Sequence, residues 1–240
     1  CMINEDQLIQ SLPQYHDGVI GDDAAVITGK KGQKQVITKD LLVENQHFRT
    51  HYCNPEDLAH KALQVNLSDI AAMGAKPQYV LCGIAIPKRL HLYAQTFLAA
   101  FAKACQQAKV VLIGGDTTAS PEHLFISITA TGLATKKTLK YRKAAQTGDV
   151  IGVIGNLGHA HLGWLNLEKH ENVNTPYTQS FLRPQAKNKE GVWLGKQPFV
   201  TSMMDLSDGL YIDLRRLARS AKKKAVLNMD SLSTQLDPEV

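Results

Sequence analysis

Residues 55–74 read PEDLAHKALQVNLSDIAAMG and decide the fold of the first half of the chain. Apolar residues recur at helical spacing through this stretch, and both of its ends carry helix signals. Asn54 suits the N-cap and Pro55 the first turn, two acidic residues complement the positive helix start, and Gly74 marks the end. The stretch therefore predicts one long amphipathic helix.

Strand-like segments surround this helix. They read KQVITKDLLV before it (34–43) and QYVLCGIAIP after it (78–87). A second helix is predicted over residues 92–108, followed by strands at 109–115 and 124–134. The order β, α, β, α, β, β predicts an α+β fold, in which an N-terminal mixed sheet carries both helices on one face.

The apolar periodicity lapses over residues 138–149, so we expect two domains, 1–137 and 138–240. The second is predicted to be an α/β domain that is C-terminally incomplete. Its expected elements are strands at 149–155 and 224–230 and helices at 162–170, 185–196 and 209–220. In the first domain, a short helix is also expected near residues 4–12. The glycine-bearing turn at 155–163 fits either a phosphate contact or a plain strand-to-helix connection.

Composition narrows the class of protein. The chain has 240 residues, 44% hydrophobic and 20% charged, which is ordinary for a globular protein. Apolar runs are far shorter than the ~20 residues of a membrane span, residues 1–15 lack the pattern of a secretory signal, and the four cysteines show no zinc spacing. The net charge of +5 is dispersed rather than gathered into a nucleic-acid-binding face. We expect a cytoplasmic protein with reduced cysteines and neither a nucleic-acid nor a membrane partner.

Aspartates inside apolar segments are the main chemical signal. Seven of them lie in VIGDDAAV, VITKDLLV, VNLSDIAAM, VLIGGDTT and MMDLSDGL, namely Asp22, Asp23, Asp40, Asp69, Asp116, Asp205 and Asp208. A buried carboxylate costs several kcal/mol unless it is paired or bound to metal, and few cations stand near these in sequence. Magnesium prefers oxygen ligands and commonly bridges carboxylates to phosphates, so several Mg²⁺ ions are expected.

Asp69 strengthens this interpretation, because helical spacing aligns it with Leu58, Ala62 and Val65 and so predicts that it faces inward. The alternative is that single aspartates near glycines are turn residues or caps, and Asp208 in particular fits an N-cap. Five such segments together favour the metal site. No P-loop, GxSxG elbow, HExxH helix or protein-kinase signature is present, so no side-chain nucleophile is expected.

Six strings resemble the thiamine-monophosphate kinase family in content and order: GDDAAVI (21–27), TKDLLVENQHF (38–48), HKALQVNLSDIAAMGAKP (60–77), LIGGDTT (112–118), YRKAAQTGD (141–149) and DLSDGL (205–210). The family is related to aminoimidazole ribonucleotide synthetase and selenophosphate synthetase. The resemblance implies transfer of the γ-phosphoryl group of ATP to thiamine monophosphate, Mg²⁺ as cofactor, and a homodimer formed through the N-terminal domain.

The resemblance also implies roles for individual residues. The metal ligands would be Asp22 or Asp23, together with Asp40, Asp69, Asp116, Asp205 and Asp208. Thr38 would also contact the metal. Gly115, Asp116, Arg142 and Ser207 would bind ATP, and His47 would hold the thiamine substrate.

Two departures from the family pattern stand out. Lys39 occupies a position where the family often has a hydroxyl residue, so its ammonium either contacts phosphate or points to solvent. The GGEDYE-like motif and late aromatic of the family do not occur in these 240 residues. Two alternative functions stay open: an ADP-forming synthetase of the same group and a non-catalytic nucleotide-binding remnant.

Overall fold

The computed structural model describes residues 8, 9, 11, 12, 20–29, 32–169, 174–228, 230 and 232. Its strands are β1 (Ala25–Thr28), β2 (Gln33–Val43), β3 (Lys76–Pro87), β4 (Val111–Ser120) and β5 (Phe125–Thr135). Its α-helices are α3 (Pro55–Ala72), α4 (His91–Ala108), α5 (His159–Glu168), α6 (Pro176–Leu182), α7 (Asn188–Gly195) and α8 (Leu210–Ser220). Two 3₁₀ turns, η2 (Lys88–Leu90) and η3 (Arg142–Ala144), complete the list. The helix expected near residues 4–12 lies largely outside the described residues.

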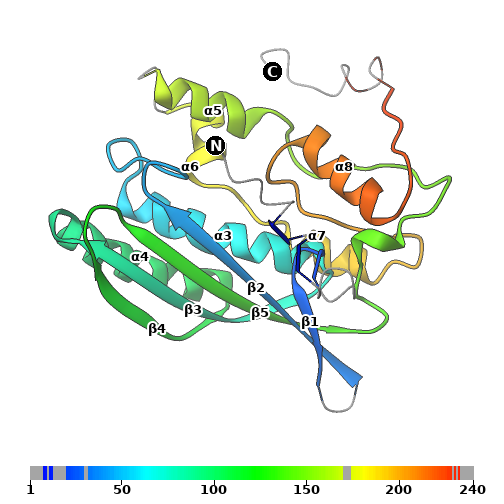
Figure 1. Cartoon of the computed structure of the whole chain (residues 1–240), viewed down its shortest axis with the longest axis horizontal. Coiled ribbons are helices and arrows are strands. Elements are labelled where there is room, and N and C mark those ends of the chain that lie inside the picture. Colours follow the sequence, from blue (N-terminus) through cyan, green and yellow to red (C-terminus); the bar gives the residue numbers. More distant parts are fainter. Residues whose placement is uncertain are drawn as a thin grey trace.

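The five strands form one mixed sheet in the order β1-β2-β5-β3-β4 (Figure 1). Neighbouring strands are antiparallel except β3 and β4, which are parallel and are joined through α4. A parallel pair needs such a crossover, because a tight turn cannot reverse the chain twice. The predicted α+β fold with a mixed sheet is confirmed, and β1 is the strand that the sequence did not predict.

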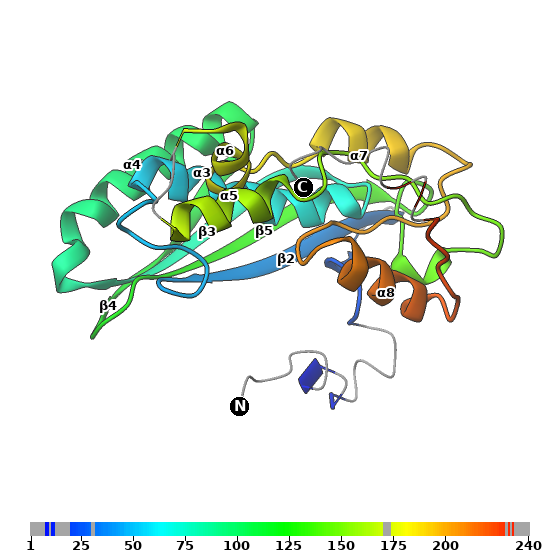
Figure 2. The ribbon, with the colours of Figure 1, turned by 90° about the horizontal axis from the view of Figure 1, so that it is seen from above.

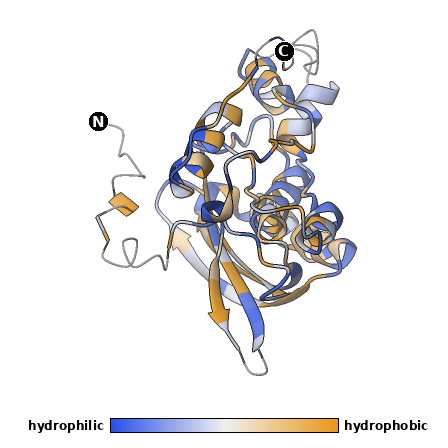
Figure 3. Ribbon diagram, turned by 90° about the vertical axis from the view of Figure 1, so that its right-hand side faces the viewer, coloured by the Kyte–Doolittle hydropathy of each residue, from blue (hydrophilic) through white to orange (hydrophobic). Residues whose placement is uncertain are grey.

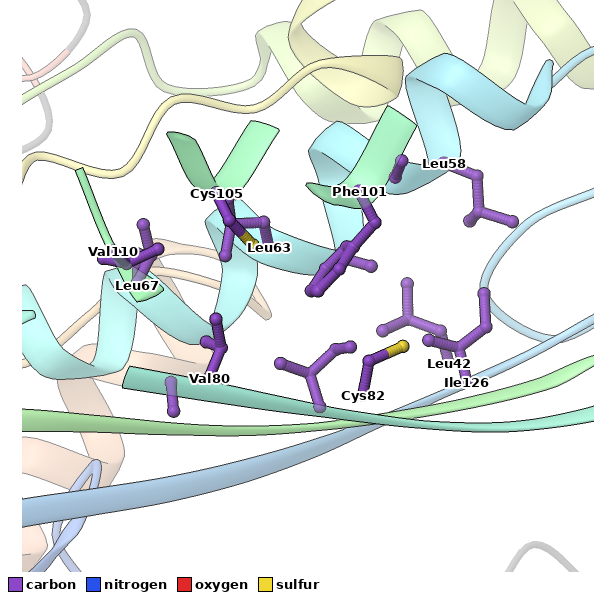
Figure 4. Close-up of a cluster of buried hydrophobic side chains, with 14 of the residues drawn as sticks. Leu42, Leu58, Leu63, Leu67, Val80, Cys82, Phe101, Cys105, Val110 and Ile126 are labelled. Carbon is purple, nitrogen blue, oxygen red and sulfur yellow. The ribbon is translucent and has the colours of Figure 1, made fainter. Parts of the chain in front are cut away.

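Helices α3 and α4 lie side by side on one face of the sheet (Figure 2), as predicted. Alternate residues of the strands point at them, including Val80 and Cys82 of β3 and Ile126 of β5, all buried. Figure 4 shows these side chains meeting Leu63 and Leu67 of α3 and Phe101 of α4. This layer is the main hydrophobic core, and it holds α3 rigidly against β2 and β5.

Helix α3 begins and ends as its sequence predicts. Asn54 is the N-cap, and its Oδ1 accepts a hydrogen bond of 2.7 Å from the backbone N–H of Asp57. Gly74 follows the helix with φ +68°, and a Cβ there would lie 2.3 Å from the carbonyl oxygen of Thr138. Only glycine combines that backbone conformation with so close an approach.

The second half of the described chain is helical. Figure 3 shows orange and blue segments alternating along the helices, as amphipathic helices require. Helices α5, α7 and α8 correspond to the three predicted there, whereas α6 falls in a stretch expected to be a polar loop. Its signal is Thr175-Pro176: Thr175 caps the helix through a reciprocal pair of hydrogen bonds with Thr178.

Two predicted strands are wrong. Residues 149–155 and 224–228 form no strand, and Val150 and Val226 are 95% and 85% exposed. A strand is stable only beside a hydrogen-bonding neighbour, and among the described residues neither segment pairs with a strand. Among the described helices, none combines the length and apolar content that crossing a membrane requires.

Candidate metal and phosphate site

The site is built first on β2 and α3. Thr38 and Asp40 alternate along β2 and so point to the same face, towards α3. Asn66 and Asp69 lie one turn apart on α3 and meet them. The backbone N–H of Asp40 donates to Oδ1 of Asn66 at 3.2 Å, and the Thr38 hydroxyl donates to Oδ2 of Asp69 at 2.5 Å. The prediction that Asp69 faces inward is thereby explained: it faces β2.

The segment before β1 adds a second pair of carboxylates. Asp23 has its side chain fully buried, and Arg142 of η3 donates to it from Nη2 at 2.6 Å and from Nε at 3.3 Å. Asp22 accepts a 2.7 Å bond from the backbone N–H of the same Arg142. Arg142 was expected at nucleotide phosphates. In this structure its guanidinium is engaged by Asp23, a cation that the sequence order did not place near the aspartates.

Asp205 arrives from the second half of the chain and completes the cluster. Its backbone N–H donates to Oδ1 of Asp23 at 3.3 Å, and carboxylate oxygens of Asp23, Asp69 and Asp205 all lie within 4.8 Å of one another. Of the three carboxylates only Asp23 is bonded to a guanidinium, so Asp69 and Asp205, when ionised, have no ion-pair partner in the described part of the chain. This charge and this all-oxygen donor set fit a divalent magnesium ion.

The pKa values of the cluster follow from this crowding. Burial, and then the charge of Asp40, raise the pKa of Asp69 to about 8, against the opposing hydrogen bond from Thr38. Burial and the charge of Asp23 raise the pKa of Asp205 above its ordinary range, and burial also raises that of Asp22. Without a cation Asp69 and Asp205 retain protons near neutral pH. A metal that binds them displaces those protons.

A small pocket of about 190 Å³ opens beside the cluster and is lined by residues 20–25 and 37–39. Asp22, Asp23 and Thr38 are among its walls. The described part of the site therefore offers a cavity with carboxylate and hydroxyl oxygens on one side.

Gly115 and Asp116 lie elsewhere. They belong to β4, at the opposite edge of the sheet from β1, and Asp116 is exposed. Register explains the separation: Gly115 pairs with Cys82 on the helix face, so Asp116, paired with Gly83, points to the other face. Lys39 also points to that other face, where its Nζ donates to Ser127 at 2.5 Å. Lys39 is exposed there, which agrees with the expectation that its ammonium points to solvent.

Ser207 and Asp208 form the turn that precedes α8. Their backbone N–H groups and that of Gly209 donate to Oδ2 of Asp213, at 2.9–3.1 Å. The Asp208 side chain pairs with Arg216, and the N-cap residue is Gly209, so the N-cap interpretation of Asp208 is wrong. Asp208 is 49% exposed and stands outside the three-carboxylate cluster.

His47 lies in the loop after β2, where its Nδ1 accepts a 3.0 Å hydrogen bond from the backbone N–H of Val43. Burial, and to a lesser degree the charge of Lys61, lower the pKa of His47, and Asp40 acts in the opposite direction. The charge of Asp40 therefore acts on the pKa values of both His47 and Asp69.

Sequence reasoning missed two residues that organise the site. Asn66 could have been found, because it lies one helical turn before Asp69 and so faces the same strand. Asp213 gives a weaker signal: a carboxylate in the first turn of a helix suits the exposed N–H groups there, but nothing in the sequence shows that it gathers three of them.

Known proteins resemble the chain closely. A family model described as AIR synthase related protein, N-terminal domain, matches residues 21–134. The thiamine-monophosphate kinase of Bacillus subtilis (strain 168) is 32% identical over 91% of this chain and 71% of its own length. The chain belongs to the thiamine-monophosphate kinase family. Another member, from Buchnera aphidicola subsp. Schizaphis graminum, is 36% identical over 89% of this chain, which spans 66% of that relative's length.

A solved structure agrees with the family assignment. The protein described as "AaThiL complexed with AMPPCP and TMP" is 29% identical, has a TM-score of 0.83, and aligns with 98% of this chain and 80% of its own. In the present chain, the residues matched by the family model, 21–134, include Asp23 and Asp69, whereas Arg142 and Asp205 lie after them. The cluster therefore forms only when both halves of the chain pack together.

Proposed function

We propose that the chain transfers the γ-phosphoryl group of ATP to the phosphate of thiamine monophosphate, giving thiamine diphosphate and ADP. The observation that carries this proposal is the cluster of Asp23, Asp69 and Asp205, in a chain aligned over most of its length with thiamine-monophosphate kinases. The similar structure described with AMPPCP and TMP supports the same pair of substrates.

The residues that would hold Mg²⁺ are those that converge from β2, α3 and the second half of the chain. Asp23, Asp69 and Asp205 supply the central carboxylates, with Asp22, Asp40 and Thr38 around them. Mg²⁺ bound there would neutralise charge between two phosphate groups and so let them approach. Arg142 fixes Asp22 and Asp23 in place through its backbone N–H and its guanidinium.

No side-chain nucleophile or general base is needed in this proposal. Phosphoryl transfer depends mainly on positioning and charge neutralisation, and the second pKa of a phosphate monoester is about 6, so the acceptor is largely ionised near neutral pH. Thr38, bonded to Asp69, and Asn66, bonded to the strand, hold the carboxylates in position. We place ATP at Ser207 and Arg142, and thiamine monophosphate at His47.

We also propose a homodimer. The sheet face opposite α3 and α4 is uncovered in the described chain, and exposed apolar side chains lie on it. We call it the open sheet face; it carries Leu41, Tyr79, Leu81, Val111 and Phe125. Contiguous exposed apolar surface of this kind marks an interface.

Asp116 and Asp208 lie outside the carboxylate cluster of their own chain. Their proposed roles as metal ligands, and the proposed role of Gly115 and Asp116 at the nucleotide, therefore require another part of the assembly, such as a second copy of the chain, to come close to them.

The domain boundary near residues 137 and 138 is proposed on the same grounds. Residues 1–137 would provide the sheet, the dimer contact and most carboxylates, and 138–240 would close the site with Arg142 and Asp205. We place the reaction in the cytoplasm, because it consumes ATP.

The test incubates the purified protein with ATP, Mg²⁺ and thiamine monophosphate and measures thiamine diphosphate and ADP. Equal amounts of both products are expected, with no product in EDTA. Binding of ATP and Mg²⁺ without turnover would contradict the proposal and favour a nucleotide-binding remnant. ADP formation that does not depend on thiamine monophosphate would instead favour an ADP-forming synthetase.

A further inference from the structure

The loop that follows β2, residues 44–53, is fixed at both of its ends, and we call it the β2 loop. At its start, the buried carboxylate of Glu44 pairs with Arg89 of η2 at 2.7 Å. At its end, the hydroxyl of Tyr93 of α4 donates to the carbonyl oxygen of Cys53 at 2.6 Å. Between these anchors, the position of the loop depends on further contacts.

The β2 loop sets the direction of the His47 ring. Nδ1 of His47 accepts a 3.0 Å hydrogen bond from the backbone N–H of Val43, and the backbone N–H of His47 donates to the carbonyl oxygen of Val43 at 2.9 Å. A neutral imidazole that accepts at Nδ1 carries its proton on Nε2. The position of the loop therefore decides where this N–H donor points.

Glu168, at the end of α5, contacts the β2 loop from the second half of the chain. Its Oε1 accepts a 2.9 Å hydrogen bond from the hydroxyl of Tyr52 and lies 3.5 Å from Nε of Arg49. The ring of Tyr52 also meets the ring of Phe181 of α6 edge to face, with centroids 6.4 Å apart. Arg49 lies only two residues after His47. One carboxylate thus connects two side chains of the loop to a helix of the second half.

Helix α5 is itself held in place, so Glu168 belongs to an anchored element. A Cβ at Gly163 of α5 would lie 2.0 Å from the carbonyl oxygen of Tyr177, which shows how closely α5 packs on α6. Arg183, directly after α6, pairs with Asp57 of α3 at 2.6 Å. The contact at Glu168 therefore joins two fixed parts of the chain, and a hydrogen bond to a carboxylate is stronger than one between neutral groups.

We propose that Glu168 is a positioning residue for the acceptor substrate, acting through the β2 loop. The inference rests on the proposed function, which places thiamine monophosphate at His47. Through Tyr52 and Arg49, Glu168 holds the loop and with it the N–H donor of the histidine. Its effect falls on the acceptor and not on ATP, because Glu168 contacts the loop rather than the carboxylate cluster. Packing of the two halves thereby completes the acceptor site as well as the cluster.

The decisive variant is Glu168→Ala, which removes the hydrogen-bond acceptor of Tyr52 and the charged partner of Arg49. We expect the KM for thiamine monophosphate to rise about 3- to 10-fold, as the net loss of one hydrogen bond implies, while the KM for ATP changes less than twofold. Tyr52→Phe, which removes one hydroxyl and keeps the ring, should give a smaller rise in the same direction. Glu190→Ala, at an exposed position of α7, is the matched control and should leave both constants unchanged.

Rescue and coupling separate positioning from a merely structural role. Glu168→Gln keeps an oxygen that can accept from Tyr52, so it should recover part of the loss. In a double-mutant cycle, Tyr52→Phe should add little to the KM for thiamine monophosphate once residue 168 is alanine, because both changes remove the same bond. An unchanged KM for thiamine monophosphate in Glu168→Ala, or equal rises in both KM values, would overturn the proposal.

If the wild type formed no thiamine diphosphate, the proposed function would fail on its own. The β2 loop would then be followed by amide hydrogen exchange without substrate, which reports local opening. Faster exchange at the N–H groups of His47 and Cys53 in Glu168→Ala than in Glu190→Ala would support Glu168 as the residue that holds the loop. Equal exchange in the two variants would overturn it.

Discussion

At the scale of single residues, charge crowding dominates the site. Asp23, Asp69 and Asp205 approach within 4.8 Å, and only Asp23 has a guanidinium partner among the described residues. Ordinary structural aspartates are capped or paired, as Asp213 is by three backbone N–H groups. A cluster that costs stability is typical of a functional site, because selection keeps it for another reason.

The variant Asp69→Asn tests whether the carboxylate cluster destabilises the fold, through the pH dependence of the melting temperature. Because the pKa of Asp69 is raised to about 8, the folded protein retains a proton that the unfolded chain releases near its ordinary pKa of about 4. The stabilisation is complete below about pH 4 and is lost as the pH rises towards 8. In EDTA, the melting temperature of the wild type should therefore fall relative to that of Asp69→Asn between pH 5 and 9, measured by scanning calorimetry.

The same variant should lose at least about 100-fold in turnover and most of the rise in melting temperature that Mg²⁺ gives the wild type, since a neutral amide binds the ion poorly. Glu190→Gln, an exposed carboxylate of α7, is the control and should behave as the wild type does. Equal pH slopes and equal turnover would mean that Asp69 is structural.

At the scale of elements, the register of the sheet places Gly115 and Asp116, which are adjacent in one sequence motif, on opposite faces of the sheet. Gly115 faces Cys82 so closely that a Cβ would lie 1.8 Å from the Cys82 carbonyl oxygen. The register shifts beside it, between Val80 and Leu81, where β4 bulges at Ile113. This glycine is thus needed for β3 and β4 to pair, whatever its part in nucleotide binding.

Gly115→Ala should therefore destabilise the protein by about 3 kcal/mol or more, because backbone rather than a flexible side chain occupies the space. Urea denaturation measures the loss of unfolding free energy. Gly152→Ala is the matched control: a Cβ there meets no atom within 4 Å, so its effect should stay within about 0.5 kcal/mol. A stable Gly115→Ala protein would contradict the observed strand spacing.

At the scale of the whole molecule, one face of the sheet is covered and the other is not. Helices α3 and α4 cover the first (Figure 2), while Leu81 and Val111 remain 39% and 55% exposed on the open sheet face. Burying such a surface against a second copy would remove apolar area from water at about 25 cal/mol per Å². The open sheet face is therefore where we expect self-association.

The double variant Leu81→Glu, Val111→Glu should convert a dimer into a monomer in analytical ultracentrifugation, because two like charges per copy would be buried face to face. Leu92→Glu adds a charge on the outer side of α4, where Leu92 is 76% exposed, and should leave the association state unchanged. A dimer that persists in the double variant would place the interface elsewhere.

Much of the first half of the fold could be predicted from local chemistry. The caps of α3, the apolar face of α4 and the alternation in β2 are properties of a few adjacent residues, so they are legible in the sequence. The second half was harder. Residues 149–155 have the composition of a strand but pair with no strand among the described residues, and α6 is signalled only by Thr175-Pro176.

The sequence by itself determined the kind of site: aspartates in apolar segments require cations, and their spelling and order indicate the family. Only the tertiary structure decided which of them meet. Asp23, Asp69 and Asp205 are brought together by packing of segments distant in the chain, whereas Asp116 is turned to the opposite face by the pairing of β4 with β3. The physical reason is that strand register and helix packing, which set the direction of each side chain, depend on contacts between distant residues that no local pattern records.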